Sequence, residues 1–164
     1  MAIDRILVPL DGSDLAEAAL EIALELASEQ PAAQLVLLRA AEAPTSMAGD
    51  RMEDRARLVR EAETYLHGVA AGLREAGISR VKTCVWYGPA AATIVEAAES
   101  EGASLIVMTS HGHGGLGRMI FGSVVESVLR GTRTPILIVR DVGAPVSPPL
   151  GATTIGSSRD ASVA

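Results

Sequence analysis

Lysine is almost missing from this 164-residue sequence, and Lys82 is the only one. A Walker-type phosphate-binding loop needs a lysine beside its glycines, so this class of nucleotide site is excluded. Schiff-base chemistry is left with a single candidate. Any bound phosphate would therefore be held by backbone N–H groups, hydroxyls, arginine or a metal ion.

Cysteine and aromatic residues are also scarce. Cys84 is alone, so it forms no internal disulfide and nothing calls for an oxidising compartment. The aromatic side chains are Tyr65, Trp86, Tyr87 and Phe121, so aliphatic residues and alanine must fill the core. Few rings and a net charge of -6 argue against nucleic acid or an anionic membrane surface as a partner, because both kinds of binder need stacking or basic groups.

Long apolar runs are missing as well. The chain reaches Pro9 after a very short apolar stretch, which predicts neither a signal peptide nor a membrane span. Hydrophobic residues make up 48% of the sequence, enough to bury a core in a domain of ordinary size. We therefore expect a cytoplasmic protein with one folded domain.

Apolar runs alternate with amphipathic stretches along the first 140 residues. Runs of the strand type cover 5–10, 34–40, 80–86, 105–109 and 135–140, and helical spacing follows from Asp14, from Leu58 to Ala76, after Pro89 and over about 123–130. Asp14 is the expected cap of the first helix, with Glu17 three residues later. This alternation predicts an α/β fold with an open parallel sheet covered by helices on both faces.

The last segment of the chain differs from the rest in composition. Half of the residues in 141–164 are Gly, Pro, Ser or Thr, and the few aliphatic ones show no period. We expect a domain over 1–140 and a flexible tail over 141–164. A tail that wraps a partner subunit is the alternative.

Two turns are candidates for a binding site, because ligands of open α/β sheets lie beyond the carboxyl ends of the strands. The first turn contains Asp11, which can bind a ribose hydroxyl, hold a divalent cation or simply satisfy the turn around Gly12. The second covers 109–123 and reads TSHGHGGLGRMIFGS. Its clustered glycines let backbone N–H groups approach an anion, and Gly122-Ser123 opens a helix whose N-terminus favours one. Glycines that only shape a loop, with Ser123 as a helix cap, are the structural alternative.

Other readings of the second turn have weaker support. Residues 112–117 spell G-x-G-x-x-G, but the dinucleotide-binding fingerprint belongs to the first strand and needs a later acidic residue, where Leu137 stands. His111 and His113 are spaced as zinc ligands, yet only Asp11 offers a third. A hydrolase built on Ser110 lacks a nucleophile-elbow sequence, and Arg118 fits either a terminal phosphate or a solvated surface.

Three segments resemble the universal stress protein family over about residues 3–140. They are RILVPLDGSDLAEAAL at the start, YGPAAATIVEAAE in the middle and VMTSHGHGGLGRMIFGSVVESVLRGTRTPILIVR from Val107 to Arg140. The resemblance implies an adenine-nucleotide alpha hydrolase-like single domain, with a five-stranded sheet of order 3-2-1-4-5, and a homodimer. It also implies that the first and fourth strands are neighbours.

The ATP-binding branch of this family holds phosphates with G-x-x-G, nine residues, then G-[S/T]. Gly112, Gly122 and Ser123 match this spacing, and Thr109 replaces the first glycine. By the same resemblance adenine lies near Pro9, Ala40 and Met108, with Asp11 near the ribose. The complete set of implied nucleotide contacts is Pro9, Leu10, Asp11, Ala40, Met108, Thr109, His111, Gly112, Gly122, Ser123 and Val124.

The resemblance favours an ATP-binding, nucleotide-sensing stress-response protein, with Mg²⁺ or Mn²⁺ as a possible companion and at most weak ATP hydrolysis. A family member that binds no nucleotide and acts through protein contacts is the alternative, to which Thr109 points. An adenylating or hydrolysing enzyme would need His111 or His113 as its reactive group. We expect Ile136, Leu137, Ile138 and Val139 to line a two-fold contact, because an apolar edge strand is a liability unless another chain pairs with it.

Overall fold

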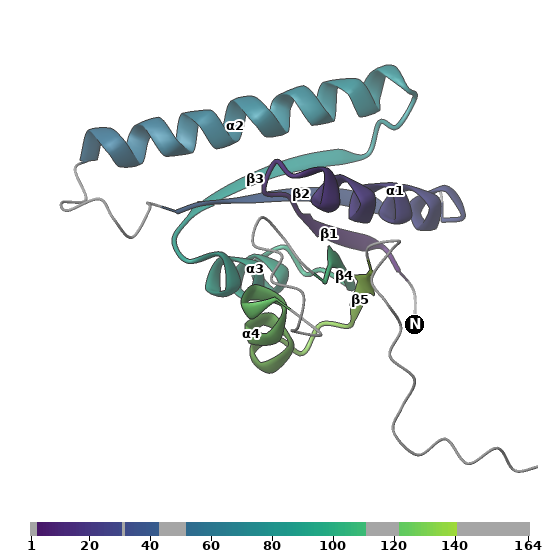
Figure 1. The fold of residues 1–164 in the computed structure, drawn as a ribbon. Helices are drawn as coiled ribbons and strands as arrows, with labels where there is room; N and C mark the ends of the chain where they lie inside the picture. Colours follow the sequence, from purple (N-terminus) through teal and green to yellow (C-terminus); the bar gives the residue numbers. More distant parts are fainter. Residues whose placement is uncertain (1–2, 31, 43–51, 111–121, 141–164) are drawn as a thin grey trace, which may run out of the picture.

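A computed structural model describes residues 3–30, 32–42, 52–110 and 122–140 of the chain. Strands and helices alternate along it (Figure 1). Their bounds are β1 Arg5–Pro9, α1 Asp14–Ser28, β2 Gln34–Ala41, α2 Met52–Glu75, β3 Val81–Tyr87, α3 Ala90–Ser100, β4 Leu105–Thr109, α4 Ser123–Gly131 and β5 Ile136–Val139. The predicted α/β alternation is confirmed.

The five strands form one parallel sheet in the order β3-β2-β1-β4-β5. β1 pairs with β2 from Arg5 opposite Gln34 to Pro9 opposite Leu38, and β4 flanks it on the other side. The strand order therefore reverses between β1 and β4: the chain continues from β1 to β2 on one side and from β4 to β5 on the other. Because the strands are parallel, the residues that follow β1 and β4 emerge at the same edge of the sheet, as the family resemblance implied.

Helices cover the sheet on both faces: α1 and α2 lie above it in Figure 1, and α3 and α4 lie below. Strand side chains alternate between two aliphatic cores as a consequence. One core contains Ile6, Val8 and Leu37 with side chains of α1 and α2. The other contains Leu7, Leu38 and Ile106 with side chains of α3 and α4. A run that is apolar at every position is what a parallel sheet buried on both faces requires.

The cap of α1 differs from the prediction. Ser13, not Asp14, is the N-cap residue, with extended backbone angles of φ -91° and ψ 151°. Its Oγ accepts a hydrogen bond of 3.2 Å from the N–H of Ala16, while Asp14 is the first helical residue. Asp11 favours this register because its carboxylate accepts from both the N–H and the hydroxyl of Ser13. The helix therefore begins at Asp14, directly after its cap Ser13.

Helix α2 begins six residues before the predicted start at Leu58, at Met52, and runs for 24 residues. Its first turns extend beyond the end of the sheet in Figure 1, and Met52 is 87% exposed. These turns carry charged residues and little apolar surface, so helical periodicity gave no signal there. No helix among the described residues is both long and apolar enough to span a membrane.

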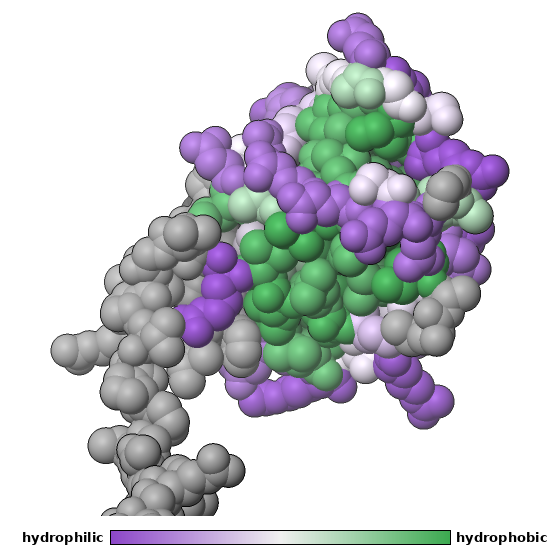
Figure 2. Space-filling model, turned by 90° about the vertical axis from the view of Figure 1, so that its right-hand side faces the viewer, coloured by the Kyte–Doolittle hydropathy of each residue, from purple (hydrophilic) through white to green (hydrophobic). Residues whose placement is uncertain are grey.

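The surface is mixed in character. On the side that lies to the right in Figure 1, hydrophobic side chains lie above and below a band of hydrophilic ones (Figure 2). At the sheet edge, Leu137 of β5 is 37% exposed although it is apolar. Since β5 is the last strand of the sheet, one row of its backbone groups has no neighbouring strand among the described residues.

Candidate functional site

The three predicted adenine contacts lie on one face of the sheet, at the ends of neighbouring strands. Met108 is buried in the core that α3 and α4 cover. Alternation along β1 and β2 puts Pro9 on the side of Leu7, and Ala40 on the side of Leu38, both of which belong to that same core. Pro9 and Ala40 are only partly buried, so this end of the core is accessible. A flat apolar ring fits such a surface.

Leu10 differs from these three residues in direction. Its side chain is 3% exposed and belongs to the opposite core, under α1 and α2. Its N–H donates a hydrogen bond of 2.8 Å to the carbonyl of Leu38, which extends the pairing of β1 and β2 beyond Pro9. Only the backbone of Leu10 therefore borders the candidate site.

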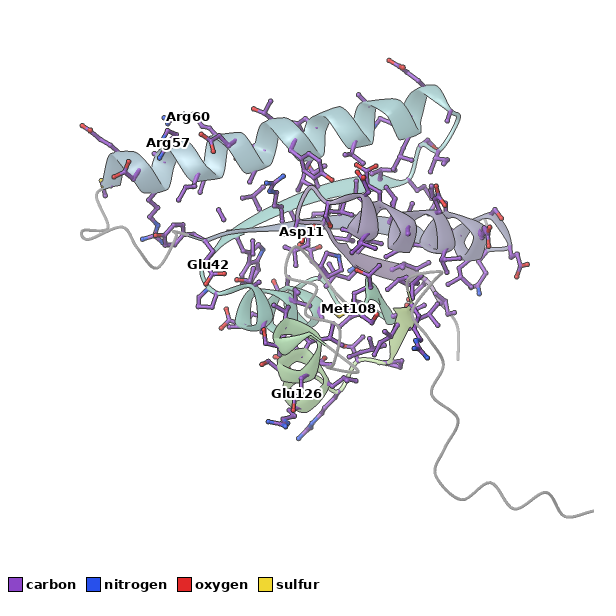
Figure 3. All side chains as sticks on the ribbon, in the orientation of Figure 1. Asp11, Glu42, Arg57, Arg60, Met108 and Glu126 are labelled. Carbon is purple, nitrogen blue, oxygen red and sulfur yellow. The ribbon has the colours of Figure 1, made fainter. Side chains whose placement is uncertain are left out.

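Asp11 follows β1 in an exposed turn, and Met108 lies in β4, the strand that pairs with β1 (Figure 3). Its Oδ1 accepts from the N–H of Ser13 at 3.0 Å and from the hydroxyl of Ser13 at 2.6 Å. Gly12 has a φ of +84°, a conformation that glycine adopts without strain. The turn thus fixes one oxygen of the carboxylate and holds the side chain at the carboxyl end of the sheet.

Thr109 ends β4 opposite Val139 of β5 and is half-buried. Alternation directs its side chain to the face opposite that of Met108, and its register partner Val139 packs against that other core. No residue other than glycine has a positive φ within the described ranges, so Thr109 has ordinary strand geometry. Neither the backbone conformation nor the direction of its Cβ conflicts with a ligand beside Met108.

The N-terminus of α4 is held beside the end of β4 by one backbone hydrogen bond. The N–H of Gly122 donates to the carbonyl of Ser110 at 2.8 Å, and the N–H of Ser110 donates to Val139 at 2.9 Å. Ser123 and Val124 follow in the first turn of the helix, and both are exposed. The N–H groups of a first helical turn have no acceptor within their own helix, so they are suitable donors for an anion.

Several predicted residues lie outside the described part of the chain: His111, Gly112, His113 and Arg118. Their predictions stay as they are. Within the described ranges, no group of three or more His, Cys, Asp or Glu side chains is placed to hold a metal ion.

A second carboxylate near the site was not predicted. Glu42, which follows β2, accepts a hydrogen bond of 3.3 Å from the N–H of Ala90 in the first turn of α3 (Figure 3). Residues 42 and 90 are far apart in sequence, and only the pairing of β2 with β3 brings them together. One of the free donors at this helix N-terminus is therefore already satisfied by the protein.

Arg39 and Tyr65 form a further contact, which no local pattern in the sequence predicts. The Arg39 guanidinium carbon lies 4.5 Å from the centre of the Tyr65 ring. Burial raises the pKa of Tyr65 first, and the nearby carboxylates of Glu17 and Asp11 raise it further, while Arg39 lowers it. The Tyr65 ring thus contacts the cation of Arg39, and its hydroxyl is influenced by the charges of Glu17 and Asp11.

Cys84 is the single cysteine of the sequence. It lies in β3 and is half-buried, and Trp86 Nε1 donates to its Sγ at 2.8 Å. Burial raises the pKa of the thiol, with the carboxylate of Glu101 adding to the effect. The thiolate is therefore disfavoured at neutral pH, as in an unreactive cysteine.

The sequence model of the universal stress protein family matches residues 2–140, a range that contains every described residue of the chain. This chain belongs to the universal stress protein family. The family's universal stress protein YxiE from Bacillus subtilis is 33% identical over 147 residues, which cover 84% of this chain and 99% of the relative.

Solved structures agree with this family membership. The protein MJ0577 of Methanocaldococcus jannaschii superposes with a TM-score of 0.73 and 27% identity, covering 86% of this chain and 98% of the other. A universal stress protein solved in complex with cAMP superposes with a TM-score of 0.58 and 25% identity, covering 85% and 98% of the two chains. The predicted fold and strand order are thus confirmed, and one structural relative binds a nucleotide.

Proposed function

We propose that this chain is an ATP-binding universal stress protein that senses adenine nucleotide and acts as a regulatory homodimer. One observation carries the proposal. Pro9, Ala40 and Met108 share a face at the ends of three adjacent strands, beside the first turn of α4. An apolar surface next to the N–H donors of a first helical turn matches the two chemically different ends of a nucleotide. The relative in complex with cAMP supports a nucleotide as the ligand.

The assignment of contacts follows from this arrangement. Adenine packs against Pro9, Ala40 and Met108, and the Asp11 carboxylate accepts a hydrogen bond from a ribose hydroxyl. The phosphates bind the N–H groups of Ser123 and Val124 and the Ser123 hydroxyl, with Gly112 completing the loop. His111 and the backbone of Leu10 and Thr109 border the ligand. A Mg²⁺ or Mn²⁺ ion bound to the phosphates would reduce their charge.

Thr109 is compatible with this site. It replaces the first glycine of the family's phosphate-binding pattern, but its strand geometry is regular and its side chain is directed away from the face of Met108. A universal stress protein that binds no nucleotide and acts through protein contacts is the second candidate, because Thr109 remains the one departure from the pattern.

The experiment is calorimetric titration of the purified chain with ATP, with and without Mg²⁺, beside the variant Gly122→Val. Gly122 has φ -68° and ψ 157°, which valine adopts readily, so the variant adds bulk at the phosphates without straining the backbone. Ser127→Val, an exposed substitution farther along the same helix, is the control. Saturable binding to the parent and the control, lost in Gly122→Val, is the expected result. A folded parent that binds no ATP would favour the protein-contact candidate.

We expect sensing and not turnover. The only lysine, Lys82, is paired with Glu101 at 2.6 Å on β3, and Glu126, the carboxylate in the first turn of α4, is paired with Arg130. Weak hydrolysis assisted by a metal ion is the most that these groups support. The further parts of the proposal are a domain over 1–140, a tail over 141–164 and a cytoplasmic location.

A further inference from the structure

The turn that carries Asp11 is backed by a side chain from another strand. A Cβ built on Gly12 would lie 3.3 Å from Arg39 Nη1, so the guanidinium packs directly against this glycine. Contact this close depends on the missing side chain of Gly12 and on its φ of +84°. Gly12 is thus in contact with Arg39 on one side and covalently joined to Asp11 and Ser13.

Arg39 is in turn held by helix α2. Its guanidinium lies over the Tyr65 ring at 4.5 Å, an arrangement in which a cation is attracted by the face of the ring. The Tyr65 hydroxyl is buried and has no hydrogen-bond partner within the described residues. The contact with Arg39 is therefore made by the ring and not by the hydroxyl. Tyr65, Arg39 and Gly12 form a continuous stack from α2 to the turn after β1.

Arg39 acts from behind the site and not within it. Alternation along β2 places Arg39 on the face of α1 and α2, whereas the next residue, Ala40, is on the face of the assigned adenine contacts. The Arg39 side chain therefore leaves the sheet on the face opposite to that of the assigned adenine contacts. Its contact nearest to the candidate site is the one with Gly12, in the turn of residues 11–13.

We propose that Arg39, stacked on Tyr65, is a positioning residue that fixes the Asp11 turn and so sets the preference of the site for the ribose of a nucleotide. This inference rests on the proposed function. With the turn fixed, the Asp11 carboxylate has one orientation toward a ribose hydroxyl. With Arg39 removed, Gly12 is free to sample other conformations, and Asp11 loses that orientation while the phosphate contacts at α4 are unchanged.

The first test compares the affinities for ATP, 2′-deoxyATP and 3′-deoxyATP by calorimetry in the full chain. The parent is expected to bind at least one deoxy analogue about tenfold more weakly than ATP, as loss of one hydrogen bond to a carboxylate predicts. Arg39→Met and Tyr65→Leu are expected to bring this ratio close to one. Tyr65→Phe keeps the ring and should retain the ratio.

Arg57→Met is the matched control, because Arg57 is an exposed arginine of α2 that pairs with Asp54 and Glu61 and not with the turn (Figure 3). It should behave as the parent. An unchanged ratio in Arg39→Met would overturn the inference while leaving ATP binding, and with it the proposed function, intact.

The second test needs no nucleotide and separates positioning from general stability. Amide hydrogen exchange by NMR is measured at Ser13 and Ala16, whose N–H groups donate to Asp11 and Ser13, and at the buried Val36. Arg39→Met should speed exchange at the first two about tenfold and leave Val36 unchanged. Equal acceleration at all three, or none, would contradict positioning. If the parent binds no ATP, the proposed function fails, and this measurement alone decides whether Arg39 holds the turn.

Discussion

Single residues in the first turn show how a neighbour decides the role of a side chain. Ser13 and Asp14 are both good helix caps, and either can start α1. The carboxylate of Asp11 accepts from Ser13 and holds it in an extended conformation, which makes Ser13 the cap. Asp14 then contributes only a negative charge to the first turn of the helix.

Replacing the cap tests this assignment. Ser13→Ala removes the acceptor of the Ala16 N–H, so we expect the free energy of unfolding to fall by about 1 kcal/mol. Asp14→Ala is the control, with a smaller expected loss because it removes no cap hydrogen bond. Urea denaturation followed by circular dichroism measures both. A larger loss in Asp14→Ala would restore Asp14 as the cap.

Among the described elements, α2 is the longest, and only part of it packs on the sheet. It is 24 residues long, or about 36 Å, and its first turns have no sheet beneath them (Figure 1). Its buried residues are limited to Ala62, Leu66 and Ala70, while Tyr65 packs beside them and reaches Arg39. The element therefore joins a small buried stripe to a contact with the candidate site.

Two glycines inside α2 lead to a prediction of increased stability. Gly68 and Gly72 are exposed, and a Cβ added at either meets nothing within 4 Å. Gly68→Ala should raise the free energy of unfolding by up to about 1 kcal/mol, because alanine loses less backbone entropy in a helix. Gly77→Ala is the contrasting variant: space is open there too, but a φ of +91° should make it destabilising. Thermal and urea denaturation distinguish the two; a loss of stability in Gly68→Ala would contradict the account.

The whole molecule presents a sheet edge at β5 on which an identical chain can pair. β5 ends the sheet beside β4, and Leu137 is exposed to 37% in the middle of this strand. A two-fold contact through β5 would cover Leu137 and provide hydrogen-bond partners for the outer backbone groups of the strand. For this reason we propose that the dimer interface lies at β5.

Sedimentation analysis tests the dimer. We expect the parent to be a dimer at micromolar concentration and Leu137→Lys to be a monomer, since a charge would be buried without a partner at the contact. Leu129→Lys is the control, because Leu129 is a comparably exposed leucine, at 43%, on α4 and away from β5. A monomeric parent, or a Leu137→Lys variant that remains dimeric, would rule out this interface.

The sequence by itself determined the alternation of strands and helices and the two turns that matter, because hydrophobic periodicity and turn chemistry are encoded within a few neighbouring residues. It also indicated the residues of the candidate site through local motifs such as Asp11-Gly12-Ser13. Boundaries without apolar signal, such as the start of α2 at Met52, could not be found in this way.

Only the tertiary structure decided which residues meet across the sheet. Whether Leu10 and Thr109 face the site or the opposite core depends on strand alternation within the registered sheet. The stack of Tyr65 on Arg39 and of Arg39 on Gly12 depends on how β2 pairs with β1 and how α2 packs above them. Contacts between residues so far apart in sequence leave no local pattern, because they are set by the packing of elements and not by the residues beside them.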